Sequence, residues 1–224
     1  GTFSSTAGLS INASTGEINI AASTAGTYTV SYVTSSNLCA VTGTFNVTIT
    51  DDEDGTFTYA SAEYCVSGSD PTPTISGTTG GTFSSTAGLS INASTGEIDL
   101  SASTAGTYTV SYLTSSNTCA VTGTFDVTIT DDEDGTFTYA ATEYCKSGSN
   151  PTPTVTGTTG GTFSSTAGLS INASTGEIDI AASTAGTYTV SYLTSSNLCA
   201  TTATHGVIIS ADEDGTFTYA SAEY

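Results

Sequence analysis

Apolar and polar residues alternate with a period of two along most of the chain. Residues 106–116 place tyrosine and valine in one phase and threonine and serine in the other. Residues 123–130 do the same, with phenylalanine, valine and isoleucine against threonine and aspartate. Such alternation is typical of half-buried β-strands. Since no segment shows a 3.6-residue period over three turns, we predict an all-β chain.

Shorter apolar segments predict the remaining strands. Residues 89–92 and 97–100 flank a turn that contains Gly96, which predicts a hairpin. Residues 136–140 and 151–157 read as two more extended segments, the second with prolines spaced as in an edge strand. About six or seven short strands in each stretch of about 80 residues predict an antiparallel β-sandwich.

The sequence is a tandem array. The phrase GTFSSTAGLSINASTGEI begins at Gly1, Gly81 and Gly161, and residues 1–80 differ from residues 81–160 at 12 positions. The strand before each DDEDG run should finish one domain, and the strand after it should begin the next. We therefore expect, within a fragment of a longer array, a truncated repeat at 1–50, complete repeats at 51–130 and 131–210, and the first strand of a further repeat at 211–224.

The run GLSINASTGEIDLSASTAGTYTVSY, at 88–112, resembles the immunoglobulin-like repeats of giant bacterial surface adhesins, including the gliding-type adhesins of Bacteroidetes. All three copies carry the Gly-Leu-Ser, Ser-Thr-Gly-x-Ile and Ala-Gly-Thr-Tyr elements of that pattern. The resemblance covers nearly the whole chain. It implies tandem immunoglobulin-like β-sandwich repeats in an extended rod, secretion, and a very long parent protein.

The Gly-Thr-Tyr element also fits a tyrosine corner, in which a tyrosine hydroxyl bonds back to the backbone a few residues upstream. The candidates are Tyr28, Tyr108 and Tyr188. The cysteine that immunoglobulin domains carry two residues later is Val110 here, and the chain has no tryptophan. The usual disulfide between the two sheets is therefore not expected.

The five cysteines predict a disulfide framework in an oxidising compartment. They are Cys39, Cys65, Cys119, Cys145 and Cys199, with alternating spacings of 26 and 54 residues. We favour the 54-residue pairs, Cys65–Cys119 and Cys145–Cys199, because each would stay inside one domain. The 26-residue pairs, Cys39–Cys65 and Cys119–Cys145, remain the alternative.

Charge narrows the possible partners. The chain has 21 acidic residues and a single basic one, Lys146, for a net charge of -20. Nucleic-acid binding is not expected, because it needs basic residues to neutralise phosphates. Docking on anionic membranes needs basic clusters too. No apolar run approaches the roughly 20 residues that span a bilayer.

The acidic runs at the predicted junctions are candidate calcium sites. Clustered carboxylates repel one another, and Ca²⁺ takes oxygen ligands from such segments. The alternative is a solvated acidic spacer that keeps neighbouring domains apart. Glu63, Glu97 and Asp99 could complete a coordination shell. The candidate ligands in the runs are Asp51, Asp52, Glu53, Asp54, Asp131, Asp132, Glu133, Asp134, Asp212, Glu213 and Asp214.

Catalytic chemistry is not indicated. His205 is the single histidine and takes the place of Phe45 and Phe125 in the other copies, which favours local sequence drift. No GxSxG element occurs. Glu97 and Asp99 fall on one strand face, whereas acid–base hydrolysis needs two carboxylates that face each other across a cleft. We expect no enzyme, no catalytic residue and no certain cofactor beyond possible Ca²⁺.

The sequence thus predicts a structural segment of an extracellular bacterial surface adhesin, stalk or filament. Its partners would be neighbouring repeats of the same chain or filament, with any glycan or protein ligand elsewhere in the parent. A different hypothesis is that each repeat is a glycan- or protein-binding module. A minor third one is a fibre subunit that polymerises by donating residues 215–224 to the next molecule.

Overall fold

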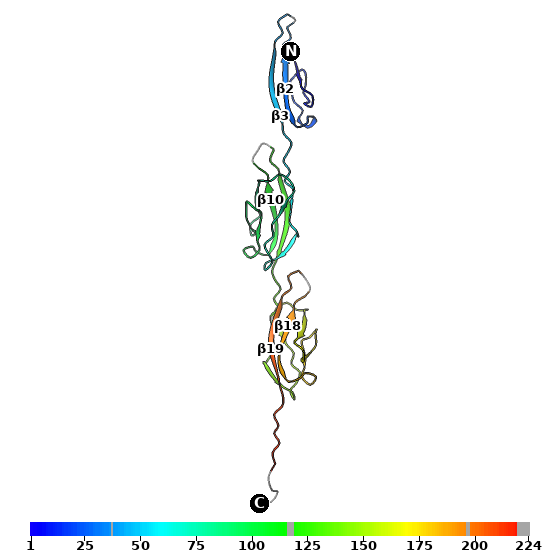
Figure 1. Cartoon of the computed structure of the whole chain (residues 1–224), viewed down its shortest axis with the longest axis vertical. Helices are drawn as coiled ribbons and strands as arrows, with labels where there is room; N and C mark the ends of the chain where they lie inside the picture. The colour runs from blue at the N-terminus through cyan, green and yellow to red at the C-terminus, as the bar shows by residue number, and fades with distance from the viewer. Residues whose placement is uncertain (37, 116–118, 196–197, 219–224) are drawn as a thin grey trace, which may run out of the picture.

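The computed structural model describes residues 1–224 except 37, 116–118, 196–197 and 219–224. The molecule is elongated, and three β-rich bodies follow one another along its long axis (Figure 1). We call them the N-terminal body (residues 2–49), the middle body (57–130) and the C-terminal body (137–210). The tandem all-β architecture expected from the sequence is confirmed.

The N-terminal body is a three-stranded antiparallel sheet in the order β1-β2-β3. Its elements are β1 (Thr2–Ser5), the 3-10 turn η1 (Ile20–Ala22), β2 (Gly26–Val33) and β3 (Thr42–Ile49). Within the described residues, no helix is long and apolar enough to cross a membrane.

The middle body contains a four-stranded sheet in the order β5-β11-β10-β7 and two short ladders, β4-β6 and β8-β9. β5 runs parallel to β11, whereas the other pairs are antiparallel. The purely antiparallel sheet that the sequence predicts is thus corrected at this edge. The strands are β4 (Phe57–Thr58), β5 (Glu63–Cys65), β6 (Thr74–Ile75), β7 (Thr82–Ser85), β8 (Ser90–Ile91), β9 (Ile98–Asp99), β10 (Gly106–Leu113) and β11 (Thr122–Thr130).

The C-terminal body repeats this plan. Its four-stranded sheet has the order β13-β19-β18-β15, with β13 parallel to β19, and its ladders are β12-β14 and β16-β17. The strands are β12 (Phe137–Thr138), β13 (Glu143–Cys145), β14 (Thr154–Val155), β15 (Thr162–Ser165), β16 (Ser170–Ile171), β17 (Ile178–Asp179), β18 (Gly186–Leu193) and β19 (Thr202–Ser210).

Each of these two bodies has its own core. In the middle body, Val110, Tyr112 and Val127 point inward from β10 and β11 and are fully buried. Phe57 of β4 covers them and meets Phe83 edge-on, with ring centroids 5.3 Å apart. Burying such apolar side chains contributes about 1.5–3 kcal/mol each. The alternating residues of β10 and β11 therefore supply the inner face of the sheet, and the residues around β4 cover that face.

The predicted hairpin at 89–100 is present as β8 and β9, with Ser90 opposite Asp99 and Ile91 opposite Ile98. Asn92 holds its turn, because Asn92 Oδ1 accepts hydrogen bonds from the N–H groups of Ser94 and Thr95 at 2.9 and 3.1 Å. Gly96 closes the turn at φ +73°, a conformation that favours glycine.

Candidate functional site

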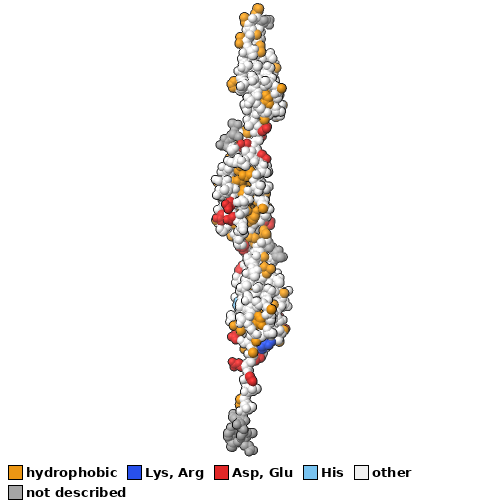
Figure 2. Space-filling model, viewed as in Figure 1, with side chains coloured by type: hydrophobic (Ala, Val, Ile, Leu, Met, Phe, Trp, Pro, Cys, Tyr) orange, Lys and Arg blue, Asp and Glu red, His pale blue; other side chains and the backbone are white. Residues whose placement is uncertain are grey.

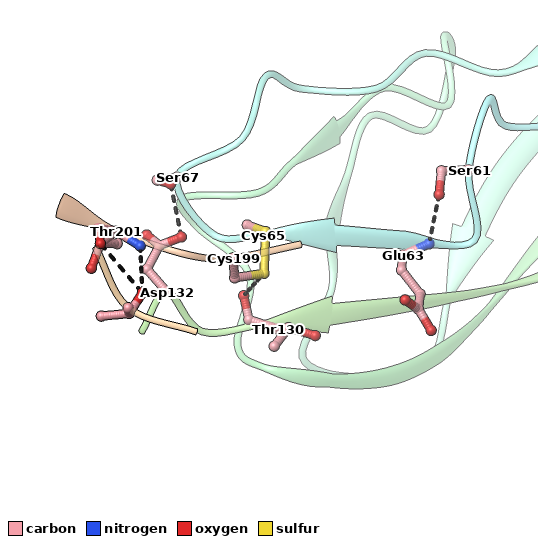
Figure 3. The surroundings of a disulfide bond; sticks show 9 residues. Ser61, Glu63, Cys65, Ser67, Thr130, Asp132, Cys199 and Thr201 are labelled. Atoms are coloured by element: carbon pink, nitrogen blue, oxygen red, sulfur yellow. Dashed lines mark hydrogen bonds between the residues drawn. A yellow bond between two sulfur atoms is a disulfide. The ribbon is translucent and has the colours of Figure 1, made fainter. Parts of the chain in front are cut away.

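The candidate functional site is the junction between consecutive bodies. A disulfide joins Cys65, at the end of β5 in the middle body, to Cys199, in the loop between β18 and β19 of the C-terminal body (Figure 3). The two Cα atoms lie 5.4 Å apart, within the usual range for a disulfide. The bond spans 134 residues of sequence and covalently ties two separately folded bodies.

This pairing corrects the one predicted from the sequence. Cys65 is not bonded to Cys119, and Cys199 is not bonded to Cys145, whose thiol is free. The parallel pairing of β5 with β11 carries Cys65 alongside Thr130, where the chain leaves the middle body. Cys119 lies in the β10–β11 loop at the other end of that body, so a bond within the body cannot form.

The alternative 26-residue pairing is also wrong. It would join Cys39 to Cys65 and Cys119 to Cys145, but Cys65 is bonded to Cys199 and the Cys39 thiol is free. Cys39 belongs to the β2–β3 loop of the N-terminal body, far along the molecule from the end of β5 (Figure 1).

The loop cysteines occupy the same place at both junctions. Cys119 Sγ lies 3.8 Å from the Thr50 carbonyl oxygen, and Cys199 Sγ lies 3.9 Å from that of Thr130. In each case the β-hairpin loop of one body reaches back to the last residues of the preceding body. The geometry that brings Cys199 to Cys65 therefore repeats at the first junction.

The glutamate in each of the first two acidic runs binds the loop of the following body. The Glu133 N–H donates to the Cys199 carbonyl at 2.9 Å, and Ser195 Oγ donates to Glu133 Oε1 at 2.6 Å. Glu53 makes the same two contacts with Cys119 and Ser115, at 3.0 and 2.8 Å. Such hydrogen bonds to a charged acceptor contribute about 1.5–3 kcal/mol. These glutamates therefore fix the linker against the next body.

In the second and third acidic runs, the aspartate before the glutamate binds the preceding body instead. Ser67 Oγ donates to Asp132 Oδ1 at 2.8 Å, beside the disulfide (Figure 3). At the end of the C-terminal body, the N–H and hydroxyl of Ser147 donate to Asp212 Oδ1 at 2.9 and 2.8 Å. The linker is thus held from both sides.

The last aspartate of each run closes a local turn. The N–H groups of Thr56, Thr136 and Thr216 each donate to the aspartate two residues earlier, at 2.9 Å. In Asp54 and Asp134, the threonine hydroxyl and then the backbone bond lower the pKa of the carboxyl below its usual value. In Asp214 the backbone bond is the larger cause. These bonds direct the chain into the first strand of the next body.

The calcium hypothesis stays a prediction. In the second acidic run, Asp132, Glu133 and Asp134 accept hydrogen bonds from three different residues, Ser67, Ser195 and Thr136. Acidic side chains are visible near the narrow junctions and also in a patch on the side of the middle body (Figure 2). Among the described residues, the one group of three potential ligand atoms within 4.8 Å of one another is formed by Cys65, Asp132 and Cys199. Two of those atoms are the disulfide sulfurs. Asp99 caps its own turn by accepting from Ser101 Oγ at 2.8 Å.

The tyrosine-corner residues bond back to the backbone in all three bodies. The hydroxyls of Tyr28, Tyr108 and Tyr188 donate to the carbonyls of Thr24, Thr104 and Thr184, at 2.6, 2.7 and 2.8 Å. Each corner fixes the start of a long strand, β2, β10 or β18. β10 and β18 each lead into the loop that contacts the preceding body.

His205 packs against aromatic rings, and Lys146 binds backbone carbonyls. The His205 ring lies 6.0 Å from that of Phe137 and 5.7 Å from that of Tyr139, as an aromatic side chain filling the position of Phe125. Lys146 Nζ donates to the carbonyls of Ile180 and Ala181 at 2.9 and 3.0 Å.

Sequence reasoning missed the serines that bind the acidic runs, and it missed the junction disulfide. A signal for the disulfide was present, because 134 residues equal one repeat of 80 plus the predicted spacing of 54. Pairing between consecutive repeats satisfies the same cysteine pattern as pairing within a repeat.

Comparison with known proteins finds no matching family model and no matching curated protein. Solved structures do show similarity. A protocadherin gammaB7 EC3-6 cis-dimer structure covers 92% of this chain and 67% of its own, at 10% identity and a TM-score of 0.38. The structure of mouse clustered protocadherin gammaC3 EC1-3 covers 95% of this chain and 89% of its own, at 12% identity and a TM-score of 0.33.

A SusE-like surface located polysaccharide binding protein from the heparin utilisation locus of Bacteroides thetaiotaomicron is also similar. The match covers 94% of this chain but 55% of that protein, at 12% identity and a TM-score of 0.32. The identities and TM-scores of these matches are too low to assign this chain to a family.

Proposed function

We propose that this chain is a structural segment of an extracellular bacterial surface adhesin, stalk or filament. Its work is mechanical: tandem bodies space distant parts of a larger assembly. The single observation that carries the proposal is the disulfide between Cys65 and Cys199, because it crosses a junction between bodies. A bond in that place restrains the angle between neighbours, which a bond inside one body would not do.

The linker contacts support the same role. Inter-domain connections usually permit relative motion unless the interface is extensive. Here the connection is short, and Asp132 is bound to the body before it while Glu133 is bound to the body after it. Disulfides persist in oxidising compartments, which agrees with an extracellular location. The proposal also accounts for a strongly acidic surface, which keeps long neighbouring rods apart.

Electron microscopy of single molecules tests this function. The measured quantity is the distribution of the angle between the middle and C-terminal bodies, for the wild type and for the double variant Cys65→Ser/Cys199→Ser. We expect a narrow distribution in the wild type and a broad one in the variant. Cys39→Ser is the matched control and should keep the narrow distribution.

Two results would contradict the proposal. An equally broad distribution in the oxidised wild type would show that the junction does not stiffen the array. Specific binding of an isolated glycan or protein by a two-body fragment, with no effect of the disulfide on shape, would favour a binding module.

A further inference from the structure

A turn of the C-terminal body holds the ammonium group of Lys146. Lys146 Nζ donates to the backbone carbonyls of Ile180 at 2.9 Å and Ala181 at 3.0 Å, and also to that of Ser183. A lysine ammonium carries three N–H donors and no acceptor, so the number of carbonyls matches the number of donors. We call these three carbonyls, with the turn that carries them, the C-terminal cradle.

The middle body has a turn of the same construction at 99–103, which corresponds to 179–183 in the C-terminal body. Ser103 Oγ donates to the Asp99 carbonyl at 2.7 Å, and the equivalent bond in the C-terminal body has the same length. The Ala102 N–H donates to Asp99 Oδ1 at 3.0 Å, again as in the C-terminal body. The same hydrogen bonds therefore hold both turns in the same backbone shape. The middle cradle consists of the carbonyls of Leu100, Ser101 and Ser103.

The middle body supplies no cation to its own cradle, because Val66 takes the place of Lys146. The backbone at this position is alike in the two bodies. The Val66 N–H donates to the Thr130 carbonyl and the Lys146 N–H donates to the Ser210 carbonyl, both at 3.0 Å. The Val66 side chain packs against the middle core. It has no donor and ends at its γ carbons, so it cannot take the position of the Lys146 ammonium.

A second difference makes the surroundings of the middle cradle more negative. Asp70 Oδ1 accepts the Leu100 N–H at 3.0 Å, whereas in the C-terminal body the neutral Asn150 accepts the Ile180 N–H at the same distance. The C-terminal cradle thus has a built-in cation and a neutral neighbour, and the middle cradle has a carboxylate neighbour instead. Lys146 is the single basic side chain of the protein. A cation that complements the middle cradle therefore comes from another molecule.

The middle cradle can accept a further donor. The Leu100 carbonyl accepts the Ser103 N–H at 3.2 Å, but the Ile180 carbonyl accepts the equivalent bond at 3.2 Å while it also binds Lys146, since a carbonyl oxygen has two lone pairs. Ser101 is exposed, whereas Leu100 and Ser103 are buried. The turn is therefore anchored by its buried residues and reachable from solvent. Acceptors that are fixed in advance reduce the entropic cost of binding.

We propose that the middle cradle binds a primary ammonium group of a partner molecule, such as a lysine side chain of another protein, in the position that the Lys146 ammonium takes in the C-terminal body. The group would donate to the carbonyls of Leu100, Ser101 and Ser103, with the Asp70 carboxylate beside it. A body with lysine at this position closes its own cradle, and a body with valine leaves the cradle to a partner. The inference goes beyond the mechanical role proposed above and does not depend on it.

Solution NMR of the isotope-labelled full chain tests this proposal. The probes are n-butylammonium, a free amine, and Nα-acetyl-lysine N-methylamide, which carries the ammonium on a peptide backbone. Both should shift the backbone amide signals of residues 100–103 in a saturable way and leave those of residues 180–183 in place, where Lys146 fills the cradle. A response to one probe only supports the proposal and identifies the accepted source of the ammonium. A response to neither probe overturns it.

Two further probes separate hydrogen bonding from charge. The Nε-trimethyl derivative of the lysine amide has the same charge but no N–H donor. It should bind about tenfold more weakly, because the charge-assisted hydrogen bonds are lost. Potassium chloride at the same concentration should give no saturable shift of the same signals. A response to the trimethyl probe or to K⁺ that equals the response to the primary ammonium would overturn the proposal.

Exchanging residues between the two cradles supplies matched variants. Val66→Lys should place an ammonium in the middle cradle and abolish its response. Lys146→Val/Asn150→Asp should give the C-terminal cradle the composition of the middle one and create a response there. Both variants are expected to fold, because each introduces residues that the other body already carries at the same position.

Thr107→Lys is the control for added charge, since Thr107 is exposed on β10 of the middle body. It should leave the response of the middle cradle intact. A response that survives Val66→Lys, or that Thr107→Lys abolishes as fully as Val66→Lys does, would overturn the proposal.

Discussion

A single hydroxyl holds the start of the long strand in each body. Tyr108 Oη donates to the Thr104 carbonyl, and the tyrosine ring is 7% exposed. A net contribution of about 0.5–1.5 kcal/mol is usual for such a bond. This hydrogen bond therefore fixes the position at which the long strand begins.

Tyr108→Phe removes this hydroxyl and keeps the ring. We expect the middle body to lose about 1 kcal/mol of unfolding free energy, because the Thr104 carbonyl loses its partner while the ring packing stays. Chemical denaturation of a fragment containing the middle body measures the effect. Thr107→Ser, on the exposed phase of the same strand, is the control. An unchanged denaturation midpoint for Tyr108→Phe would contradict the structural role of the corner.

Alkaline pH should destabilise the bodies through Tyr59 and Tyr139. Burial is the main cause that raises the pKa of both phenols above the ordinary value of 10.0. The folded state therefore holds these protons more tightly than the unfolded state. The associated stability is present below pH 10 and is lost as the pH rises above it.

Thermal melts between pH 8 and pH 11.5 measure this dependence. The double variant Tyr59→Phe/Tyr139→Phe should start less stable, because each hydroxyl binds a turn carbonyl, but should lose less stability above pH 10 than the wild type. Parallel pH curves for the two proteins would contradict the assignment to these residues.

At the scale of the element, the acidic linker acts as a two-sided clamp. Its aspartate contacts the body before it, and its glutamate contacts the loop of the body after it. Glu133→Ala should therefore release the loop that carries Cys199. We expect the Cys65–Cys199 disulfide to be reduced several-fold faster by a thiol reagent, as followed by alkylation and gel shift.

Glu97→Ala is the matched control for this experiment, since Glu97 is exposed on the hairpin of the middle body. It removes an equal charge and should leave the reduction rate unchanged. If Glu133→Ala and Glu97→Ala both gave the same reduction rate as the wild type, the contacts of Glu133 would not protect the disulfide from reduction.

The strands were largely predictable from the sequence, and the junction was not. Alternation in 106–116 depends on the local period of side chains, so it marks β10 whatever the rest of the chain does. The parallel edge formed by β5 depends on a non-local pairing of Glu63–Cys65 with the end of β11. No local pattern encodes that direction. The predicted cysteine pairs failed because they assumed that Cys65 stays near Cys119.

At the scale of the whole molecule, Ca²⁺ is the candidate ligand of the acidic runs. In the second acidic run, Asp132, Glu133 and Asp134 already accept hydrogen bonds from Ser67, Ser195 and Thr136. We therefore expect the melting temperature of the oxidised chain to be the same in millimolar Ca²⁺ and in EDTA. A large rise with Ca²⁺ would instead show a native-state metal site, because a ligand that binds only the folded state stabilises it.

The long span of the Cys65–Cys199 bond provides a shortcut for tensile force. When the two ends of the chain are pulled apart, tension passes from residue 65 directly to residue 199, so residues 66–198 carry no load. At about 3.3–3.6 Å per residue, this hidden length is roughly 45 nm. In single-molecule pulling, the oxidised chain should extend about 45 nm less than the reduced chain or the Cys65→Ser/Cys199→Ser variant. The elements from β6 to β18 lie between the two sulfurs and bear no direct tension, whereas β4, β5 and β19 stay in the load path.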